Sequence, residues 1–188
     1  GAVVRPMWLI MLDENAKALA DGTAATQLPY IAPEQFYQWT VTIGGAGATI
    51  VVSVLFIFFC KSKFLKEVGR FSIIPGIFNI NEPMIFGAPM MLNPYMFIPF
   101  NLVPLVLTII SYFAVKLEMV NRFTVLPTWT LPAPIGGYLS AGNDWRVVIL
   151  IMINTLIAFI IYYPFVKAYD KKMLSDEQSR GENEVQTV

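Results

Sequence analysis

Long apolar runs separated by short charged clusters dominate this sequence. Four stretches are almost free of charged side chains: residues 35–60, 71–115, 123–143 and 147–166. A helix needs about 20 predominantly apolar residues to cross a bilayer. The pattern therefore predicts transmembrane helices at about residues 41–60, 100–115 and 147–166.

The composition agrees with a membrane protein. Hydrophobic residues make up 56% of the 188 positions, and charged residues make up 14%, about half the share of an ordinary soluble domain. A soluble core of this size cannot hide so much apolar side chain. The lone cysteine and the absence of histidine give no pattern for a disulfide or a metal site. The zero formal net charge gives no field that attracts nucleic acid. We therefore expect the lipid bilayer as a partner, and neither a cofactor nor nucleic acid.

Prolines interrupt two of the apolar stretches. Residues 71–99 contain five prolines and residues 123–143 contain three, so neither stretch forms a straight helix. Broken backbone at membrane depth is tolerated only where protein buries it or where it lines a cavity. We expect both stretches to be re-entrant hairpins, of the kind that forms substrate sites in transporters.

A run of small residues, Gly44–Thr49, begins the first expected span. Small residues let helix backbones approach closely, and the run lacks the lysine of a phosphate-binding loop. Packing is therefore favoured over contact between this backbone and a ligand.

Basic residues predict the orientation. Two clusters follow the first and last expected spans: Lys61, Lys63, Lys66 and Arg70, then Lys167, Lys171 and Lys172. Positively charged loops face the cytoplasm, so both clusters, and the C-terminus, are expected there. Residues 1–34 are expected to be an amphipathic interfacial segment and loop. Residues 167–188 are expected to be a frayed cytoplasmic tail.

Glu82 is the one charged residue in residues 71–115. An acid at membrane depth marks a functional site by default. Asn79 and Asn81 beside it offer donors and acceptors that suit a polyhydroxylated ligand. The alternative is a carboxylate that caps broken backbone amides. Trp129, in the second broken stretch, is either a stacking surface for a sugar ring or an interfacial tryptophan.

Several of these motifs together resemble a known family. They are Pro75-Gly-Ile-Phe-Asn-Ile-Asn-Glu-Pro83, Ile85-Phe-Gly-Ala-Pro89, the run at 44–49, Trp129-Thr130 and Pro132-Ala-Pro-Ile-Gly136. The chain resembles the membrane component IIC of bacterial sugar phosphotransferase systems, in the lactose, cellobiose and diacetylchitobiose branch. The resemblance implies an all-α integral membrane protein of the bacterial cell membrane, with transmembrane helices and proline-broken re-entrant hairpins that form the sugar site.

The resemblance also implies a mechanism. A homodimeric IIC protein binds a disaccharide, which a separate IIB protein, phosphorylated on cysteine, then phosphorylates. Glu82 matches the family's catalytic hairpin glutamate, Asn79 and Asn81 flank it as sugar ligands, and Trp129 matches the tryptophan that lines the sugar. No metal site is implied.

Two departures from the family pattern stand out. The family's essential histidine has no counterpart here, and family members are roughly twice as long. We therefore expect a C-terminal piece, inactive by itself, with residues 35–166 forming half of the transport domain. Two alternatives stay open: a secondary transporter or channel that uses Glu82 as a proton or cation site, and a membrane scaffold. The sequence does not fix which disaccharide is carried.

Overall fold

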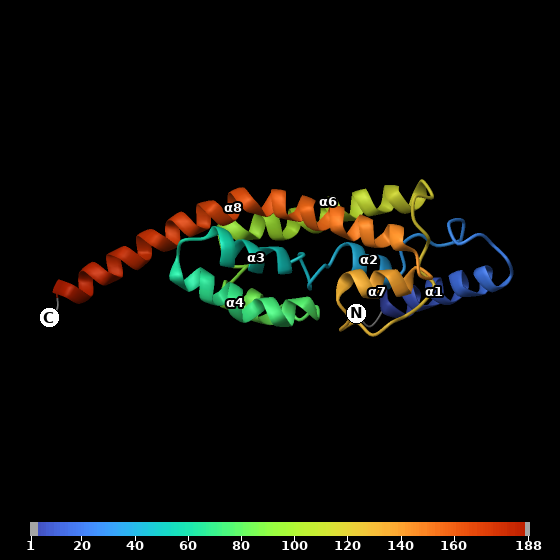
Figure 1. Cartoon of the computed structure of the whole chain (residues 1–188), viewed down its shortest axis with the longest axis horizontal. Helices are drawn as coiled ribbons and strands as arrows, with labels where there is room; N and C mark the ends of the chain where they lie inside the picture. The colour runs from blue at the N-terminus through green and yellow to red at the C-terminus, as the bar shows by residue number, and fades with distance from the viewer. Residues whose placement is uncertain (1–3, 187–188) are drawn as a thin grey trace.

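The structure is a computed structural model that describes residues 4–186, with side chains described for residues 4–179. The described residues form eight helices and no strands. The helices are α1 (Val4–Ala20), α2 (Glu34–Thr40), α3 (Ile50–Phe59), α4 (Lys63–Ile77), α5 (Glu82–Gly87), α6 (Pro94–Lys116), α7 (Ala133–Ser140) and α8 (Trp145–Gln186). The molecule is elongated, and α6 and α8 lie side by side along its long axis (Figure 1).

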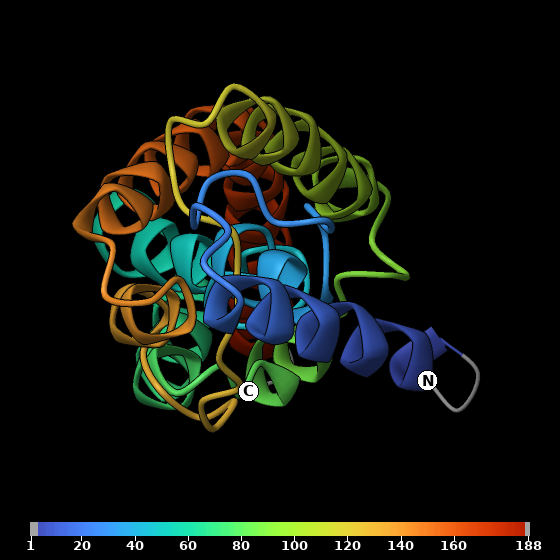
Figure 2. The same ribbon diagram turned by 90° about the vertical axis from the view of Figure 1, so that its right-hand side faces the viewer.

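The shorter helices pack in two groups along this pair. Toward the C-terminal end, α3 packs against α8 and α4 packs against α3. Toward the other end, α2 and α7 pack against α8 and against each other. Helix α1 lies across that end in the view along the long axis (Figure 2). Buried side chains from both groups form one continuous hydrophobic core.

Helices α6 and α8 contain the segments 100–115 and 147–166 that the apolar pattern singled out. Both are long and apolar enough to cross a membrane. Helix α6 begins earlier than expected, because the side chain of Asn93 accepts a hydrogen bond from the Tyr95 N–H (3.0 Å) and Pro94 occupies the first turn. Proline is well suited to that position, since its missing N–H has no partner there.

The predicted continuous helix over residues 41–60 is wrong. Helix α3 covers only its last half, and residues 41–49 form turns. The backbone φ angles of Gly44, Gly45, Gly47 and Ala48 are 70°, 100°, 79° and 54°, which an α-helix does not allow. A Cβ on Gly45 would lie 2.5 Å from the side chain of Asn81. These glycines therefore serve close packing, and we call residues 44–49 the glycine-rich turn.

The first broken stretch forms a hairpin of two helices that starts earlier than expected. Helix α4 begins at Lys63, where the Ser62 hydroxyl caps it by accepting a hydrogen bond from the Leu65 N–H (3.2 Å). Residues 78–81 form the hairpin tip, and α5 follows. In the second broken stretch, a loop over residues 121–132 precedes α7.

The expectation of a frayed tail over residues 167–188 is wrong for its described part, because α8 continues to Gln186. The buried carboxylate of Asp170 accepts hydrogen bonds from the backbone N–H groups of Lys61 (2.9 and 3.0 Å) and Ser62 (2.9 Å). Glu177 accepts hydrogen bonds from the Ser62 hydroxyl and the Phe64 N–H (3.2 Å). Carboxylates satisfy the otherwise unpaired N–H groups at the start of a helix. We call these contacts the Asp170–Glu177 brace.

At the N-terminal end, residues 4–20 of the segment that we expect at the membrane interface form helix α1. Its buried Asn15 exchanges hydrogen bonds with the backbone of Tyr30 and donates another to the Phe123 carbonyl (3.0 Å). These bonds fix α1 to the rest of the molecule.

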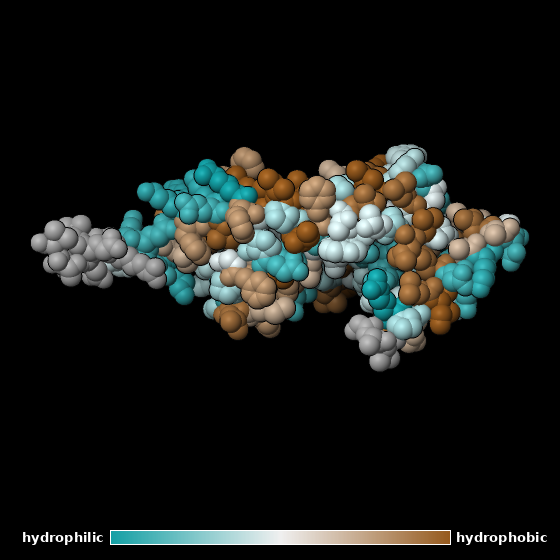
Figure 3. All heavy atoms as spheres, turned by 90° about the horizontal axis from the view of Figure 1, so that it is seen from below, coloured by the Kyte–Doolittle hydropathy of each residue, from teal (hydrophilic) through white to brown (hydrophobic). Residues whose placement is uncertain are grey.

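Large hydrophobic side chains remain exposed along both long helices. On α8 they include Ile149, Met152, Ile153, Leu156 and Ile160, whose spacing places them on one face. Seen from below, hydrophobic side chains cover much of the surface, and hydrophilic residues gather toward the two ends of the molecule (Figure 3). This distribution is what a bilayer around the middle of the molecule requires.

Candidate functional site

Asn79 joins three separate segments at the hairpin tip. Its side-chain oxygen Oδ1 accepts a hydrogen bond from the Gly44 N–H (3.1 Å), in the glycine-rich turn. Its Nδ2 group donates to the backbone carbonyls of Trp129 and Leu131, both at 2.8 Å, in the loop before α7. The two proline-broken stretches therefore meet at this one side chain.

Asn81 gives the tip a second attachment to the glycine-rich turn. Its Nδ2 group donates to the Ala46 carbonyl (3.0 Å), and its side chain lies against Gly45, where a Cβ has no room. Among the described residues, Oδ1 of Asn81 has no hydrogen-bond partner in the structure. Asn81 therefore keeps an acceptor, and one of its two N–H bonds, for a ligand.

Glu82 begins α5 directly after this tip, and its side chain is exposed. Within residues 4–179 the carboxylate has no hydrogen bond and no ion pair. The structure thus gives no sign of the capping role that the sequence left open. A free carboxylate accepts hydrogen bonds from hydroxyl groups through both oxygens.

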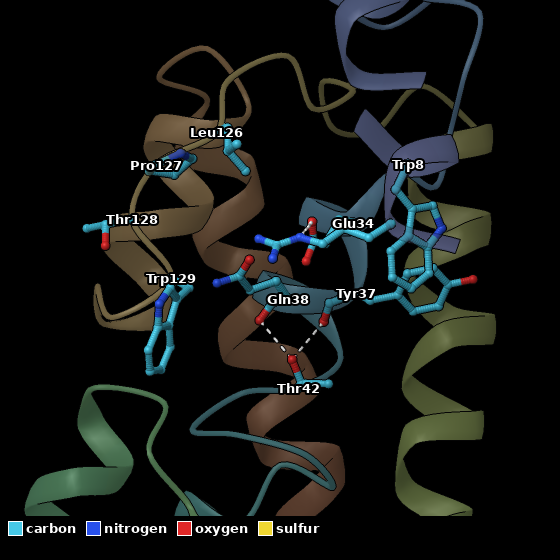
Figure 4. A pocket seen from close by; sticks show the side chains of 10 residues that line it. Trp8, Glu34, Tyr37, Gln38, Thr42, Leu126, Pro127, Thr128 and Trp129 are labelled. Atoms are coloured by element: carbon cyan, nitrogen blue, oxygen red, sulfur yellow. Dashed lines mark hydrogen bonds and ion pairs between the residues drawn. The ribbon is translucent and has the colours of Figure 1, made fainter. Parts of the chain in front are cut away.

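Trp129 lines a pocket of about 720 Å³, beside the hairpin tip that holds its backbone carbonyl (Figure 4). Its side chain is 55% exposed. The opposite wall comes from the first 42 residues of the chain. The lining residues are Arg5, Trp8, Glu34, Tyr37, Gln38, Thr42, Leu126, Pro127, Thr128 and Trp129.

The opposite wall combines aromatic rings with polar groups. The rings of Trp8 and Tyr37 lie 5.6 Å apart. Arg5 Nε donates to Glu34 Oε2 at 3.2 Å, whereas the Gln38 side chain points toward the space in front of Trp129 (Figure 4). Apolar ring faces with a few placed polar groups are typical of small-molecule sites and bind the C–H faces of a sugar while its hydroxyls stay paired.

Three anchors hold the loop that carries Trp129. At its start, Asp144 accepts a hydrogen bond from the Asn121 N–H (2.8 Å). In its middle, the Ser140 hydroxyl donates to the Val125 carbonyl (2.7 Å). At its end, Asn79 holds Trp129 and Leu131. The loop is therefore fixed along its length although it lacks regular secondary structure.

Asp144 is itself held by several donors. It also accepts from the N–H of Arg146 (3.0 Å) and from Arg146 Nε (3.0 Å). Burial alone raises the pKa of a carboxyl group, but these hydrogen bonds outweigh it and hold the pKa of Asp144 below its ordinary value. The anchor is therefore charged at neutral pH.

The sequence-predicted residues fall into two neighbouring places. Asn79 and Asn81 lie in the hairpin tip, and Glu82 directly follows it. Trp129 lines the pocket, and its backbone carbonyl is bound by the tip. The wall formed by Arg5, Trp8, Glu34, Tyr37, Gln38 and Thr42 was missed. Its residues lie in and just after a segment that reads as an interfacial helix and loop, and no motif links them to Trp129.

Comparisons with known proteins agree on one family. The sequence model described as "Phosphotransferase system, EIIC" matches residues 1–104. The cellobiose-specific EIIC component of Geobacillus stearothermophilus is 42% identical over 180 residues, which is 95% of this chain and 40% of that protein. The lactose-specific EIICB component of Staphylococcus aureus (strain N315) is 40% identical over 172 residues, 92% of this chain and 30% of that protein.

A solved structure gives the same result. The transporter ChbC, the IIC component of the N,N'-diacetylchitobiose-specific phosphotransferase system, superposes with a TM-score of 0.90 at 42% identity. The match covers 95% of this chain and 41% of that one. This likeness and the all-helical structure confirm the expected all-α membrane fold. The chain spans about two fifths of the length of ChbC and of the cellobiose-specific relative.

Proposed function

Because this chain belongs to the EIIC family of the phosphotransferase system, we propose that it is part of a permease that binds a disaccharide. The sugar is of the cellobiose, lactose or diacetylchitobiose class, and the permease presents it to a phosphorylated IIB protein. The names of the relatives support this range of substrates.

The observation that carries the proposal is the free carboxylate of Glu82 beside a tip that is tied to Trp129. In the proposed reaction, a sugar hydroxyl oxygen bonds to the phosphorus atom while the bond from phosphorus to the IIB cysteine sulfur breaks. Glu82 accepts the hydroxyl proton, and the cysteine leaves as a thiolate. Positioning and proton acceptance are what a protein supplies to a phosphoryl transfer.

The remaining contacts are assigned to the unpaired groups of Asn81 and to the residues that line the pocket. Asn81 offers its Oδ1 and one N–H bond to the sugar, and the Trp129 ring stacks on a sugar face. The pocket beyond Trp129 holds the second sugar ring, which lies between the indole ring of Trp129 and the wall formed by Tyr37 and Gln38. Arg5 and Glu34, which form an ion pair among the pocket residues, make hydrogen bonds to the hydroxyl groups of this second sugar ring.

The proposed orientation places the IIB protein at the end of the molecule that carries the brace. The brace brings the segment after α3 next to the last part of α8, so both basic clusters lie at this end. Basic loops face the cytoplasm, so we assign this end to the cytoplasmic side of the bacterial cell membrane. The complete permease acts as a homodimer.

The test uses the complete permease in membranes, with labelled cellobiose, lactose and N,N'-diacetylchitobiose as probes. We expect saturable binding of at least one disaccharide, and phosphorylation of that sugar only when phosphorylated IIB protein is added. Proton- or sodium-driven uptake of unmodified sugar, without dependence on IIB, would show that the chain belongs to a secondary transporter instead.

A further inference from the structure

We propose that Asn79 is a positioning residue, which fixes the ring of Trp129 relative to Glu82 and does not itself bind the sugar. This inference rests on the proposed function for its consequence, but the contacts that carry it are independent of any ligand. It also changes the role that the sequence indicated, since Asn79 and Asn81 look equivalent there.

The hydrogen-bonding capacity of the Asn79 amide is almost fully used. An asparagine side chain has two N–H bonds to donate and two lone pairs on its oxygen. Both N–H bonds go to backbone carbonyls, of Trp129 and Leu131, at 2.8 Å. The oxygen accepts from the buried Gly44 N–H. A sugar hydroxyl therefore finds no free donor on Asn79, whereas Asn81 has one.

The backbone of Asn79 supports the same conclusion. Its φ angle is +62°, in the left-handed region that costs most non-glycine residues energy but that asparagine tolerates. This conformation turns the chain at the tip while the side chain reaches both the glycine-rich turn and the Trp129 loop. An asparagine suits both requirements at once.

The position of Asn79 in the chain links these contacts to Glu82. Glu82 lies three residues after Asn79, at the first residue of α5. Trp129 and Leu131 lie 50 and 52 residues away and are held by the same side chain. Through Asn79, the backbone segments that carry Glu82 and Trp129 are fixed to one framework, so that in the proposed site both side chains face the same sugar. Such preorganisation is what a catalytic site needs.

The decisive variant is Asn79→Asp in the complete permease. Aspartate has almost the same shape, tolerates the left-handed φ, and keeps the acceptor for the Gly44 N–H. It removes both donors and places a carboxylate against the two carbonyls. Asn143→Asp is the matched control, because Asn143 also has a left-handed φ of 64°, is exposed, and makes no side-chain hydrogen bond within residues 4–179.

The first readout is a double-mutant cycle on disaccharide affinity with Trp129→Ala. We expect Asn79→Asp to weaken binding roughly 10- to 30-fold, as the loss of one to two hydrogen bonds does. In the Trp129→Ala background it should cause less than about a threefold further loss, because its effect acts through the ring. Losses that multiply would show that Asn79 contacts the sugar and would overturn the proposal.

The second readout needs no sugar. In protein labelled with 5-fluorotryptophan, the ¹⁹F resonance of Trp129 is assigned with Trp129→Phe. We expect Asn79→Asp to shift or broaden this resonance while that of Trp145 stays in place, and Asn143→Asp to leave the Trp129 resonance unchanged. An unchanged Trp129 resonance would overturn the proposal. If Asn79→Asp does not fold, Asn79→Gly, which also accepts a positive φ, replaces it in both experiments.

The two readouts separate this inference from the proposed function. If the wild-type permease binds none of the three disaccharides, the proposed function fails, and the fluorine spectrum still decides whether Asn79 positions Trp129. If the sugar binds but the spectrum does not respond to Asn79→Asp, the positioning role fails alone.

Discussion

The hydroxyl of Tyr162 donates a hydrogen bond to the backbone carbonyl of Gly47 at 2.7 Å, and both residues are buried. The bond joins the middle of the long helix α8 to the glycine-rich turn, 115 residues earlier. The turn in turn supports the hairpin tip through Asn79 and Asn81. The position of the site therefore depends on a buried polar contact.

Replacing Tyr162 with phenylalanine should destabilise the protein by about 1–3 kcal/mol, because the Gly47 carbonyl is left buried without a partner. The free energy of unfolding in a fixed detergent measures this effect. Tyr163→Phe is the control, since Tyr163 is 39% exposed on the neighbouring face of α8. Equal stability of the two variants would contradict the structural role of this bond.

Gly136 in α7 should not accept alanine. A Cβ there would lie 2.3 Å from the ring of Trp39, a fully buried residue of α2 that packs against α7. Overpacking of this kind costs typically 1–3 kcal/mol. Gly76→Ala provides the comparison, since the nearest atom to its new Cβ is at an ordinary 3.7 Å. We expect a lower thermal midpoint only for Gly136→Ala, and similar midpoints for both variants would show that α2 and α7 can separate.

The anchor at Asp144 should make the free energy of unfolding depend on pH under acidic conditions. Its pKa in the folded protein is lowered, so its contribution is complete above the unfolded-state pKa near 4 and is lost as the pH falls through the folded value. Asp144→Asn should reduce the free energy of unfolding at pH 7 by about 1.5–3 kcal/mol and flatten its decline below about pH 4. Unfolding measured from pH 7 to the lowest pH at which the protein stays soluble checks both effects. An unchanged acid slope would show that Asp144 is not the titrating anchor.

Glu82→Gln tests the proposed chemistry directly in the complete permease. The amide keeps the shape and one acceptor but loses the basic, charge-assisted partner. We expect sugar affinity to fall by about 1–3 kcal/mol and phosphorylation of bound sugar by about 10²–10⁴-fold. Trp129→Ala should weaken binding with less effect on the chemical step.

The control for this experiment is Glu67→Gln, because Glu67 is an exposed acid on α4. Equilibrium binding and IIB-dependent phosphorylation are measured separately in every variant. A Glu82→Gln permease that phosphorylates bound sugar at the wild-type rate would leave the carboxylate without a chemical role.

The sequence predicted the parts of the fold that depend on local apolar content. Helices α6 and α8 contain two of the expected spans because no charge interrupts them. The break at residues 41–49 was not predicted, because composition alone does not show that Gly45 and Gly47 must fit against Asn81 and Phe100. Their φ angles are fixed by neighbours that lie far away in the chain.

The same limit applies to the site and to the last part of α8. Glu82 was identifiable because a lone acid in an apolar stretch is conspicuous. Gln38 and Arg5 look like ordinary polar residues until the fold places them opposite Trp129. Asp170 looks like one of many tail charges until α8 continues and brings it to the Ser62 N–H. Chemistry that depends on such distant pairs needs the tertiary structure.

The hairpin arm α4 is held at both ends, by the brace at Ser62 and by Asn79 at its tip. The helix is therefore restrained at both ends and has no free end. A helix restrained in this way does not pivot about its start at Ser62 to move the hairpin tip alone. Any large displacement of Glu82 must therefore carry α8 and the Trp129 loop with it, or break one support first.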